Sequence, residues 1–263
     1  MFCAIFPGRS HGTRFFQLAV ILATAFVASL SHDSFAAASG MEPDAQPVAV
    51  PENYGDAMRW YERAAKAGNA RAQFYLGMLY EQGGRGKPDP QAAITWFTKA
   101  AGQGHRQAQL KLGLLYYQGP HQGPGQNTGI EQNYEEAAKW FEKAAAQSSS
   151  QATYNLALML VRGLGVRKDA KRAAELFEKA VTRGLAEAAL HLAVLYGQED
   201  KKGKNGKEPD NLKQDKLRAL MWLEWATGKG LNPDPAFHKK LAGSMTETEI
   251  AKARALALER LKN

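Results

Sequence analysis

The sequence predicts an all-α fold, an α-solenoid of about four and a half helix–turn–helix units with a helical cap at its C-terminal end. Three observations carry this prediction. Five bulky apolar anchors, each preceded at seven residues by an Asn or Asp, are Trp60, Trp96, Trp140, Leu176 and Trp222. Ala and aromatic residues recur around each anchor with the spacing of one helix face. A Gly or Ser ends each pattern eight residues after the anchor.

Residues 1–38 have the pattern of a secretory signal peptide. Two arginines precede an apolar run from Phe15 to Leu30, and small residues follow it. A basic flank, an apolar run and an Ala-rich site in this order are typical of cleaved export signals. We expect cleavage near Ala36 or Ala38 and a periplasmic or secreted mature protein. The alternative is a retained membrane anchor, although the run is shorter than the about 20 apolar residues that an anchor needs.

Residues 39–52 are rich in proline and predict a flexible tether. Cys3, the only cysteine, lies inside the predicted signal peptide. The exported mature chain would therefore contain no cysteine and form no disulfide. Such a composition suits a bacterial periplasm, where the stability of this chain must come from packing.

Residues 53–230 hold the repeats, and five predicted helices begin there after an Asn or Asp that can cap a helix. We call them the B helices, and their caps are Asn53, Asp89, Asn133, Asp169 and Asp215. Positions 4, 7, 8 and 11 after the cap hold Ala, the anchor, an aromatic or Leu, and Ala. These positions form one stripe of a helix. The alanines allow a neighbouring helix to approach, and the anchor is expected to fill the gap between helices.

A second helical pattern follows four of the Gly or Ser stops and predicts the A helices. Its first copy is Ala72, Leu76, Gly77 and Tyr80, and it returns from Ala108, Ala152 and Ala188. Each A helix pairs with the B helix that follows it, and the first unit has a B helix alone. One unit cannot bury its apolar stripe by itself, so stacked units are expected to share a continuous core.

The repeat resembles a known family, the Sel-1-like repeat, a relative of the tetratricopeptide repeat. The resemblance is carried by AQFYLGMLYEQGGRGKPDPQAAITWFTKAAGQG, by NYEEAAKWFEKAAAQS and by ATYNLALMLVRGLGVRKDAKRAAELFEKAVTRG. It covers Asn53 to Gly230. It implies a right-handed superhelix of paired helices that acts as a scaffold or adaptor for other proteins, and it names no partner.

Residues 231–263 lack the repeat pattern and predict capping helices. Thr246 and Glu249 form a capping box, and Ile250, Leu256 and Leu261 give the following helix an apolar side. Trp225 stands where the other units have Arg or Lys, so we expect the 231–262 segment to cover it.

Two insertions separate A and B helices, at 119–132 and 197–214. The first is rich in Gly, and the second is polar and mostly charged. We expect mobile loops on one edge of the stack, tolerated as surface insertions. A role in binding is the alternative.

No motif for catalysis or cofactor binding is present. The four histidines after residue 38 show no metal-ligand spacing, and neither a nucleophile motif nor a phosphate-binding loop occurs. We therefore expect no metal, no cofactor and no enzymatic activity.

The formal net charge of +8 raises the question of nucleic acid, and the predicted export argues against it. Part of the charge forms a ridge at one repeat position, made of Arg63, Lys99, Lys143 and Lys179. We expect a solvated ridge whose alkyl stems lie over aromatic rings. The alternative is attraction to an acidic component of the cell envelope.

The stripe of the A helices that packing does not use is the predicted binding surface, and the resemblance places it on the concave side. Its residues are Arg71, Tyr75, Met78 and Gln82; Gln107, Lys111, Leu114 and Gln118; Gln151, Asn155, Leu158 and Arg162; then Glu187, His191, Val194 and Gln198. In the last group His191 is the candidate. Amide side chains there suit a peptide backbone, so the expected partner is another protein or a peptide segment.

Two functions from different classes follow. The preferred one is a non-catalytic periplasmic scaffold that binds a protein. The alternative is a protein that binds or hydrolyses cell-wall glycopeptide or β-lactams. Cysteine-rich exported relatives have been linked to penicillin binding, but their cysteine framework is missing from this sequence.

Overall fold

The all-α prediction is confirmed by the computed structural model, which describes residues 54–83, 87–119, 130–198 and 214–262. Within these ranges the chain is helical and contains no strand. The B helices are α3 (Tyr54–Lys66), α5 (Pro90–Gly102), α7 (Tyr134–Ala146), α9 (Ala170–Thr182) and α11 (Lys216–Gly228). The A helices are α4 (Ala70–Gln82), α6 (Arg106–Gln118), α8 (Ser150–Arg162) and α10 (Ala188–Gly197). Two helices follow the repeats, α12 (Pro235–Ala242) and α13 (Glu247–Lys262).

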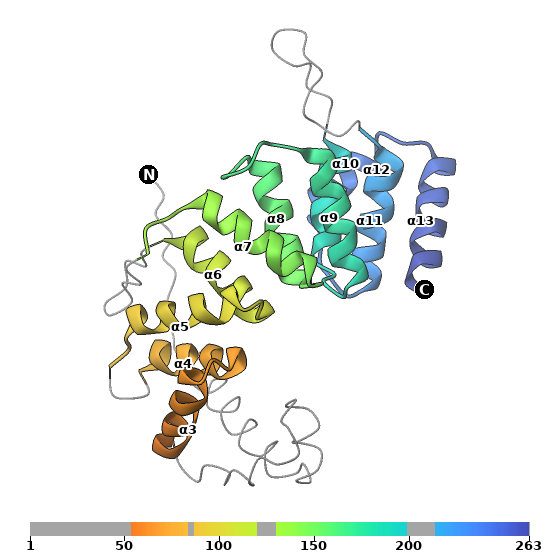
Figure 1. The fold of residues 1–263 in the computed structure, drawn as a ribbon. Helices are drawn as coiled ribbons and strands as arrows, with labels where there is room; N and C mark the ends of the chain where they lie inside the picture. The colour runs from red at the N-terminus through yellow and green to blue at the C-terminus, as the bar shows by residue number, and fades with distance from the viewer. Residues whose placement is uncertain (1–53, 84–86, 120–129, 199–213, 263) are drawn as a thin grey trace, which may run out of the picture. The chain divides into compact units, whose positions relative to one another are not determined.

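Each repeat helix packs against its neighbours along the chain, so A and B helices alternate through the stack (Figure 1). The predicted signal peptide, the tether and the greater part of both insertions lie outside the described residues. Among the described residues, no helix is long and apolar enough to cross a membrane.

The predicted helix caps form in the four B helices whose caps are described. The side chains of Asp89, Asn133, Asp169 and Asp215 each accept a hydrogen bond from the backbone N–H three residues later. Each bond satisfies one of the donors that a helix N-terminus leaves free. Asn53 lies outside the described residues.

The five stops adopt the left-handed backbone that the repeat requires. Four are glycines, with φ between 81° and 95°, and the fifth is Ser148, with φ 63°. Glycine adopts this region without steric cost, whereas a residue with a Cβ is strained there. Ser148 is the one non-glycine residue with positive φ in the described part of the chain, so the turn geometry is kept even where the sequence departs from Gly.

From the second B helix onward, the core is built around the residue after the anchor, which corrects one sequence expectation. Phe97, Phe141 and Phe177 are fully buried, and Leu223 is nearly so. Of the anchors themselves, only Trp222 is fully buried, while Trp60, Trp96, Trp140 and Leu176 are half-buried. The Phe97 and Phe141 rings contact the A helix of their own unit, whereas Trp96 and Trp140 pack against the cluster of the preceding unit.

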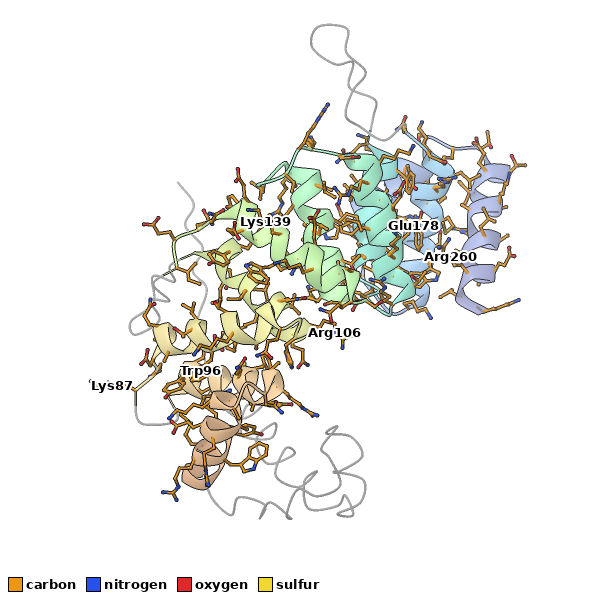
Figure 2. The ribbon with its side chains drawn as sticks, in the orientation of Figure 1. Lys87, Trp96, Arg106, Lys139, Glu178 and Arg260 are labelled. Atoms are coloured by element: carbon orange, nitrogen blue, oxygen red, sulfur yellow. The ribbon has the colours of Figure 1, made fainter. Side chains whose placement is uncertain are left out.

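The half-buried tryptophans still contact the neighbouring unit. Trp96 on α5 packs against the cluster that Met58, Ala65, Ala72 and Leu76 form between α3 and α4 (Figure 2). Trp140 packs in the same way against the cluster of α5 and α6. The Nζ atoms of Lys99 and Lys143 lie 4.2 and 4.0 Å from the centres of these two indole rings. The lysine ridge thus covers the tryptophans, as expected for amphipathic side chains.

A small residue on each A helix makes room for the buried Phe. A Cβ added to Gly77 would lie 2.7 Å from the Phe97 ring, and one added to Gly113 would lie 2.6 Å from the Phe141 ring. The equivalent residues in the next two units, Ala157 and Ala193, are fully buried. The A and B helices of the first two complete units therefore approach more closely than a methyl group would allow.

A ladder of side-chain hydrogen bonds joins successive units. Gln73 on α4 donates to the Ala65 carbonyl of the preceding B helix, at 3.1 Å, and accepts from Gln103 after the next B helix, at 2.7 Å. Gln109 repeats both contacts one unit later, donating to Ala101 O at 3.2 Å and accepting from Gln147 at 2.8 Å. Both glutamines are buried. Each buried side-chain amide therefore forms hydrogen bonds with the C-terminal ends of two successive B helices.

The third unit uses different residues for the same contact. Arg183 Nη1 donates to Thr153 Oγ1 at 3.0 Å and to the Ala145 carbonyl at 3.3 Å. Thr153 is buried and occupies the position of Gln73 and Gln109. The ladder was not predicted from the sequence, because glutamine at this position lies outside the apolar stripe.

The C-terminal helices cover α11. Trp225 is 5% exposed, as expected, and its ring lies edge-on to Trp222 with ring centres 5.8 Å apart. The capping box is confirmed, with Thr246 N donating to Glu249 Oε2 at 2.8 Å and Glu249 N donating to Thr246 Oγ1 at 3.3 Å.

The apolar side of α13 differs from the prediction. Ala253 and Ala257 are its buried residues, with Ile250 and Leu261 packed beside them, whereas Leu256 is 37% exposed. Spacings of three, four and four residues from Ile250 to Leu261 place these four on one helix face, and Leu256 lies off it.

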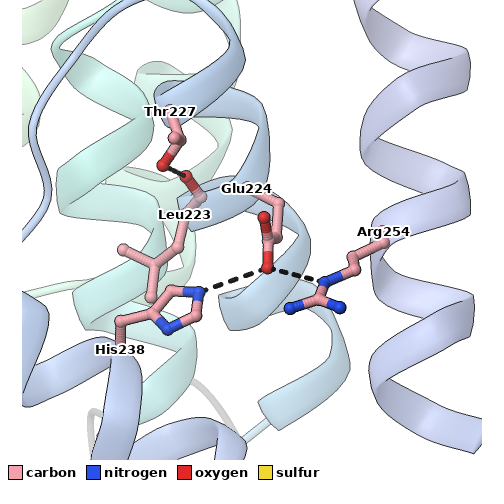
Figure 3. Close-up of polar contacts among 5 residues, drawn as sticks. All are labelled: Leu223, Glu224, Thr227, His238 and Arg254. Carbon is pink, nitrogen blue, oxygen red and sulfur yellow. Dashed lines mark hydrogen bonds and ion pairs between the residues drawn. The ribbon is translucent and has the colours of Figure 1, made fainter.

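Glu224 on α11 ties both C-terminal helices to the stack (Figure 3). Its Oε1 accepts hydrogen bonds from His238 Nε2 of α12, at 3.2 Å, and from Arg254 Nε of α13, at 3.1 Å. One half-buried carboxylate therefore joins three helices.

The close A–B contact gives the first prediction. Gly113→Ala should lower the free energy of unfolding by about 1–3 kcal/mol, because the added methyl group overlaps the Phe141 ring. We expect this loss of stability even though Ala favours the helix over Gly by about 1 kcal/mol. Gly102→Ala is the matched control, because its Cβ meets no atom within 4 Å; it should leave stability unchanged or raise it. Urea unfolding measures both, and a stabilised Gly113→Ala protein would contradict the close contact.

The ladder of side-chain hydrogen bonds gives the second prediction. Gln109→Leu should destabilise the fold by about 1–3 kcal/mol, because the buried Ala101 carbonyl loses its side-chain donor. Gln107→Leu, exposed on the same helix, should change stability by no more than about 0.5 kcal/mol. Equal unfolding midpoints for the two variants would show that the ladder contributes nothing.

The cap of α6 gives a prediction on pH. His105 Nδ1 accepts the Ala108 N–H at 3.3 Å, which requires the neutral ring, and burial, Arg71 and Arg106 lower the pKa of His105. The unfolded chain therefore binds this proton first, so stability is complete above about pH 6.5 and declines as pH falls toward the lowered pKa. His105→Asn keeps a capping acceptor and removes the titration. Its melting temperature should fall less than that of the natural protein between neutral and mildly acidic pH, and parallel declines would refute the assignment.

Candidate partner-binding face

The A face is the set of A-helix residues at the four predicted offsets. Its end positions are exposed, namely Arg71, Gln82, Gln107, Gln118, Gln151 and Arg162. Its middle positions are half-buried, namely Tyr75, Met78, Lys111, Leu114, Asn155, Leu158 and His191. Val194 is exposed in place of the half-buried apolar residue of the other units. The stripe opposite the core is thus a solvent-facing surface with apolar residues between polar ends.

Side-chain contacts connect neighbouring A helices across this face. Lys111 of α6 forms an ion pair with Glu81 of α4, with 2.8 Å between Nζ and Oε1. Arg162 of α8 donates to the Tyr117 hydroxyl of α6 at 3.0 Å. Each of these contacts brings a predicted face residue against a residue that the sequence analysis did not single out.

A third contact completes the series. The hydroxyl oxygen of Tyr154 on α8 lies 2.8 Å from Nε2 of His191 on α10. The three contacts join α4, α6, α8 and α10 in order. The predicted residues of separate units are therefore brought together into one continuous surface.

Tyr117, Tyr154 and Glu81 were missed because they lie one position away from the predicted stripe. Tyr117 and Glu81 share one repeat offset, and Tyr154 is the neighbour of Asn155 in the sequence. The tyrosines stand out as large side chains beside the stripe, in LLYYQ and QATYN. That signal marks a residue as able to reach across the stripe, although it does not say to which unit.

The Tyr154–His191 pair is held in its neutral form. Burial and then the Glu187 carboxylate raise the pKa of Tyr154, while burial and then the Arg162 guanidinium lower the pKa of His191. The Tyr154 hydroxyl and Nε2 of a neutral imidazole therefore share a hydrogen bond, whose donor depends on the tautomer of His191. That ring stacks on Phe177, with ring centres 5.2 Å apart and planes at 12°. The pair acts as a rigid contact between α8 and α10.

Asn155 occupies the middle of the face. Its Oδ1 accepts a hydrogen bond from Gln151 Nε2 at 3.3 Å, and its Nδ2 is buried without an acceptor. A buried amide N–H without a partner costs free energy. Because the protein itself covers this Nδ2, the missing hydrogen bond is a cost to the folded state and not a donor offered to a partner.

Aromatic rings dominate the N-terminal end of the face. Tyr75 contacts Tyr61 and Phe74, with ring centres 5.4 and 5.6 Å apart. Phe74 in turn stacks on His105, at 4.8 Å. The Arg71 guanidinium carbon lies 5.9 Å from the centre of the Tyr75 ring. This cluster holds Arg71 beside a packed aromatic surface.

No metal centre is formed by the part of the chain that the structure describes. Within those ranges no three His, Cys, Asp or Glu side chains lie close enough to hold an ion. The A face thus offers hydrogen bonds, positive charge and apolar contact, which are the means of binding a polypeptide.

Comparisons with known proteins agree with this architecture. The family model for the Sel1 repeat matches residues 47–69, 70–105, 106–149, 150–185 and 186–231. The second match spans α4 and α5, and each later one likewise spans one A and one B helix. No curated protein matches the chain at a significant level.

Two solved structures are similar to this chain. A Sel1 repeat protein from Oxalobacter formigenes is 28% identical, with a TM-score of 0.52, and the alignment covers 80% of this chain and 81% of that one. A protective antigen of uropathogenic Escherichia coli with an SLR fold is 25% identical, with a TM-score of 0.44. That alignment covers 81% of this chain and 50% of the antigen. Because the family model matches well over half of the sequence, this chain belongs to the Sel1 repeat family.

Proposed function

We propose that this protein is a non-catalytic scaffold of the bacterial periplasm, which binds a partner protein along the A face. Sel1 repeat proteins generally mediate protein–protein interactions, and the fold is typically a non-catalytic scaffold. The periplasmic assignment is supported by the signal-peptide pattern of residues 1–38 and by the absence of cysteine after residue 3.

One observation carries the choice of surface. The side-chain contacts Glu81–Lys111, Tyr117–Arg162 and Tyr154–His191 link the four A helices into one surface. Its apolar residues Met78, Leu114 and Leu158 are half-buried rather than exposed. A surface that is fixed before binding loses less conformational entropy when a partner binds.

The apolar stripes of the B helices, by contrast, are buried between helices and are not open to a partner. Phe97, Phe141 and Phe177 are fully buried within the stack. The half-buried Trp96 and Trp140 are covered by the lysines of their own helices. The A face therefore offers the apolar contact that a partner protein needs, together with polar groups that set its orientation.

Photocrosslinking in intact cells tests the proposal. A photoreactive residue at Lys111 or Asn155 should give a defined adduct with another protein, while one at the exposed Glu175 on α9 should give little or none. The adduct should be recovered from the periplasmic fraction, with the mature chain beginning after Ala36 or Ala38. Adducts at Glu175 alone would place the partner on the other side of the stack, and a cytoplasmic adduct would contradict the export.

The alternative is activity on cell-wall glycopeptide or β-lactams. A chromogenic β-lactam incubated with the purified mature chain should show no turnover. The Tyr154–His191 pair places a hydroxyl beside an imidazole, at 2.8 Å, so Tyr154→Phe is the informative variant. Turnover that this substitution abolishes would replace the scaffold proposal with an enzymatic one.

A further inference from the structure

We propose that the partner segment is acidic, and that Arg71 and Arg162 bind Asp or Glu side chains of that segment. The inference rests on the proposed function and deepens it, since it gives the partner a chemistry. It depends on three features of the two arginines, which are their exposure, their lack of a carboxylate partner and their fixed orientation.

Among the three basic residues of the A face, Arg71 and Arg162 have no counter-ion, whereas Lys111 has one. Both are exposed, and within the described residues no carboxylate lies within ion-pair distance of either. Lys111 is by contrast paired with Glu81, at 2.8 Å, and Arg172 of α9 is paired with Glu142, at 2.9 Å. The two arginines are therefore uncompensated charges on the same face as the apolar residues.

Tyrosine contacts hold both guanidinium groups in place. Arg71 lies over Tyr75, 5.9 Å from the ring centre, and Arg162 Nη1 donates to the Tyr117 hydroxyl at 3.0 Å. Tyr117 is itself packed edge-on against Tyr134, at 5.5 Å. Neither contact removes the positive charge, and both leave further N–H groups of the guanidinium to bind a carboxylate. An arginine held in this way loses less side-chain entropy on binding than a free one.

The positive charge influences the groups around it. After burial, Arg71 and Arg106 lower the pKa of His105 at one end of the face. Arg162, after burial, lowers the pKa of His191 on α10. Both histidines are thus kept neutral beside arginines, so the uncompensated charge is confined to the guanidinium groups.

The residues around Arg162 favour a peptide over a simple anion. Gln151, on the same face of α8 as Arg162, is exposed and carries a side-chain amide that can bind a peptide backbone. Leu158 lies between them in the sequence and is half-buried. A backbone amide at Gln151, an apolar side chain at Leu158 and a carboxylate at Arg162 would occupy all three groups. A single C-terminal carboxylate could not pair with both Arg71 and Arg162, which lie on helices two units apart; acidic side chains could.

The test uses the full mature chain and two fluorescein-labelled synthetic peptides with amidated C-termini. One alternates glutamates with leucine and serine, and the other carries glutamine in place of each glutamate. The glutamate peptide should bind more tightly, and its affinity should fall with added salt, as expected for exposed charge pairs. Arg71→Gln and Arg162→Gln should each weaken its binding about three- to tenfold.

Arg172→Gln is the matched control. It removes the same charge from an exposed arginine, but from helix α9 and from an arginine that already has a carboxylate partner. Its affinity for the glutamate peptide should equal that of the natural protein. Tyr117→Phe keeps the ring and removes the hydroxyl that positions Arg162, so it should weaken binding by a smaller factor than Arg162→Gln.

Each other outcome overturns the inference. Equal binding of the two peptides, or none, would show that the face does not select acidic segments. Equal losses of affinity for the glutamate peptide in Arg162→Gln and Arg172→Gln would show that only the net charge of the protein matters. Competition by polyphosphate, with an inhibition constant matching the glutamate peptide's Kd, would assign the site to polyanions.

Crosslinking separates this failure from failure of the proposed function. If the adducts at Lys111 and Asn155 persist in an Arg71→Gln, Arg162→Gln double variant, the face binds a partner without these arginines. The scaffold proposal then stands and the acidic assignment is wrong.

Discussion

The close contact between each A helix and the aromatic residue of its B helix is the constraint on which the rest of the structure depends. Phe141 is fully buried against a position of α6 at which even a methyl group would overlap the ring. Burial of a Phe side chain contributes about 1.5–3 kcal/mol, and the contact recurs at Phe97 with Gly77. Without the small residue the two helices would separate, and the stripe that the next unit packs against would be lost.

The sequence predicted most of the fold because its signals are local and repeated. Caps at Asp89, Asn133, Asp169 and Asp215, and a left-handed turn after each B helix, follow from chemistry within one helix end. The same reasoning failed for the anchors. Trp and Phe at adjacent positions lie on one stripe, and only the angle at which a neighbouring helix crosses decides which of them is fully buried. Periodicity within a single helix does not contain that angle.

The candidate face could be predicted by elimination, as the stripe left over from packing. The prediction was incomplete because elimination does not reveal contacts between units. Once the apolar stripe is assigned to the core, the opposite stripe is left for solvent, which gives residues such as Lys111 and Asn155. The contacts that turn these residues into one surface come from Glu81, Tyr117 and Tyr154, one position away from the stripe. Whether such a side chain reaches the next unit depends on the rotation between units. The buried glutamine ladder escaped prediction in the same way, because it joins helix ends in different units.

The last repeat helix, α11, packs against two helices that do not follow the repeat pattern, α12 and α13. Trp222 and Trp225 of α11 are buried, yet their indole N–H groups have no acceptor among the described residues, which costs free energy. The cost is offset by other contacts, since the Arg260 guanidinium of α13 lies 4.3 Å from the centre of the Trp222 ring. Glu224 binds α12 and α13 together. The alanines of α13 allow it to approach α11 closely, while its exposed Arg254 and Arg260 give the end of the stack a charged surface. The cap thus buries two tryptophans at the cost of their indole hydrogen bonds, and it presents charged side chains in place of an apolar stripe.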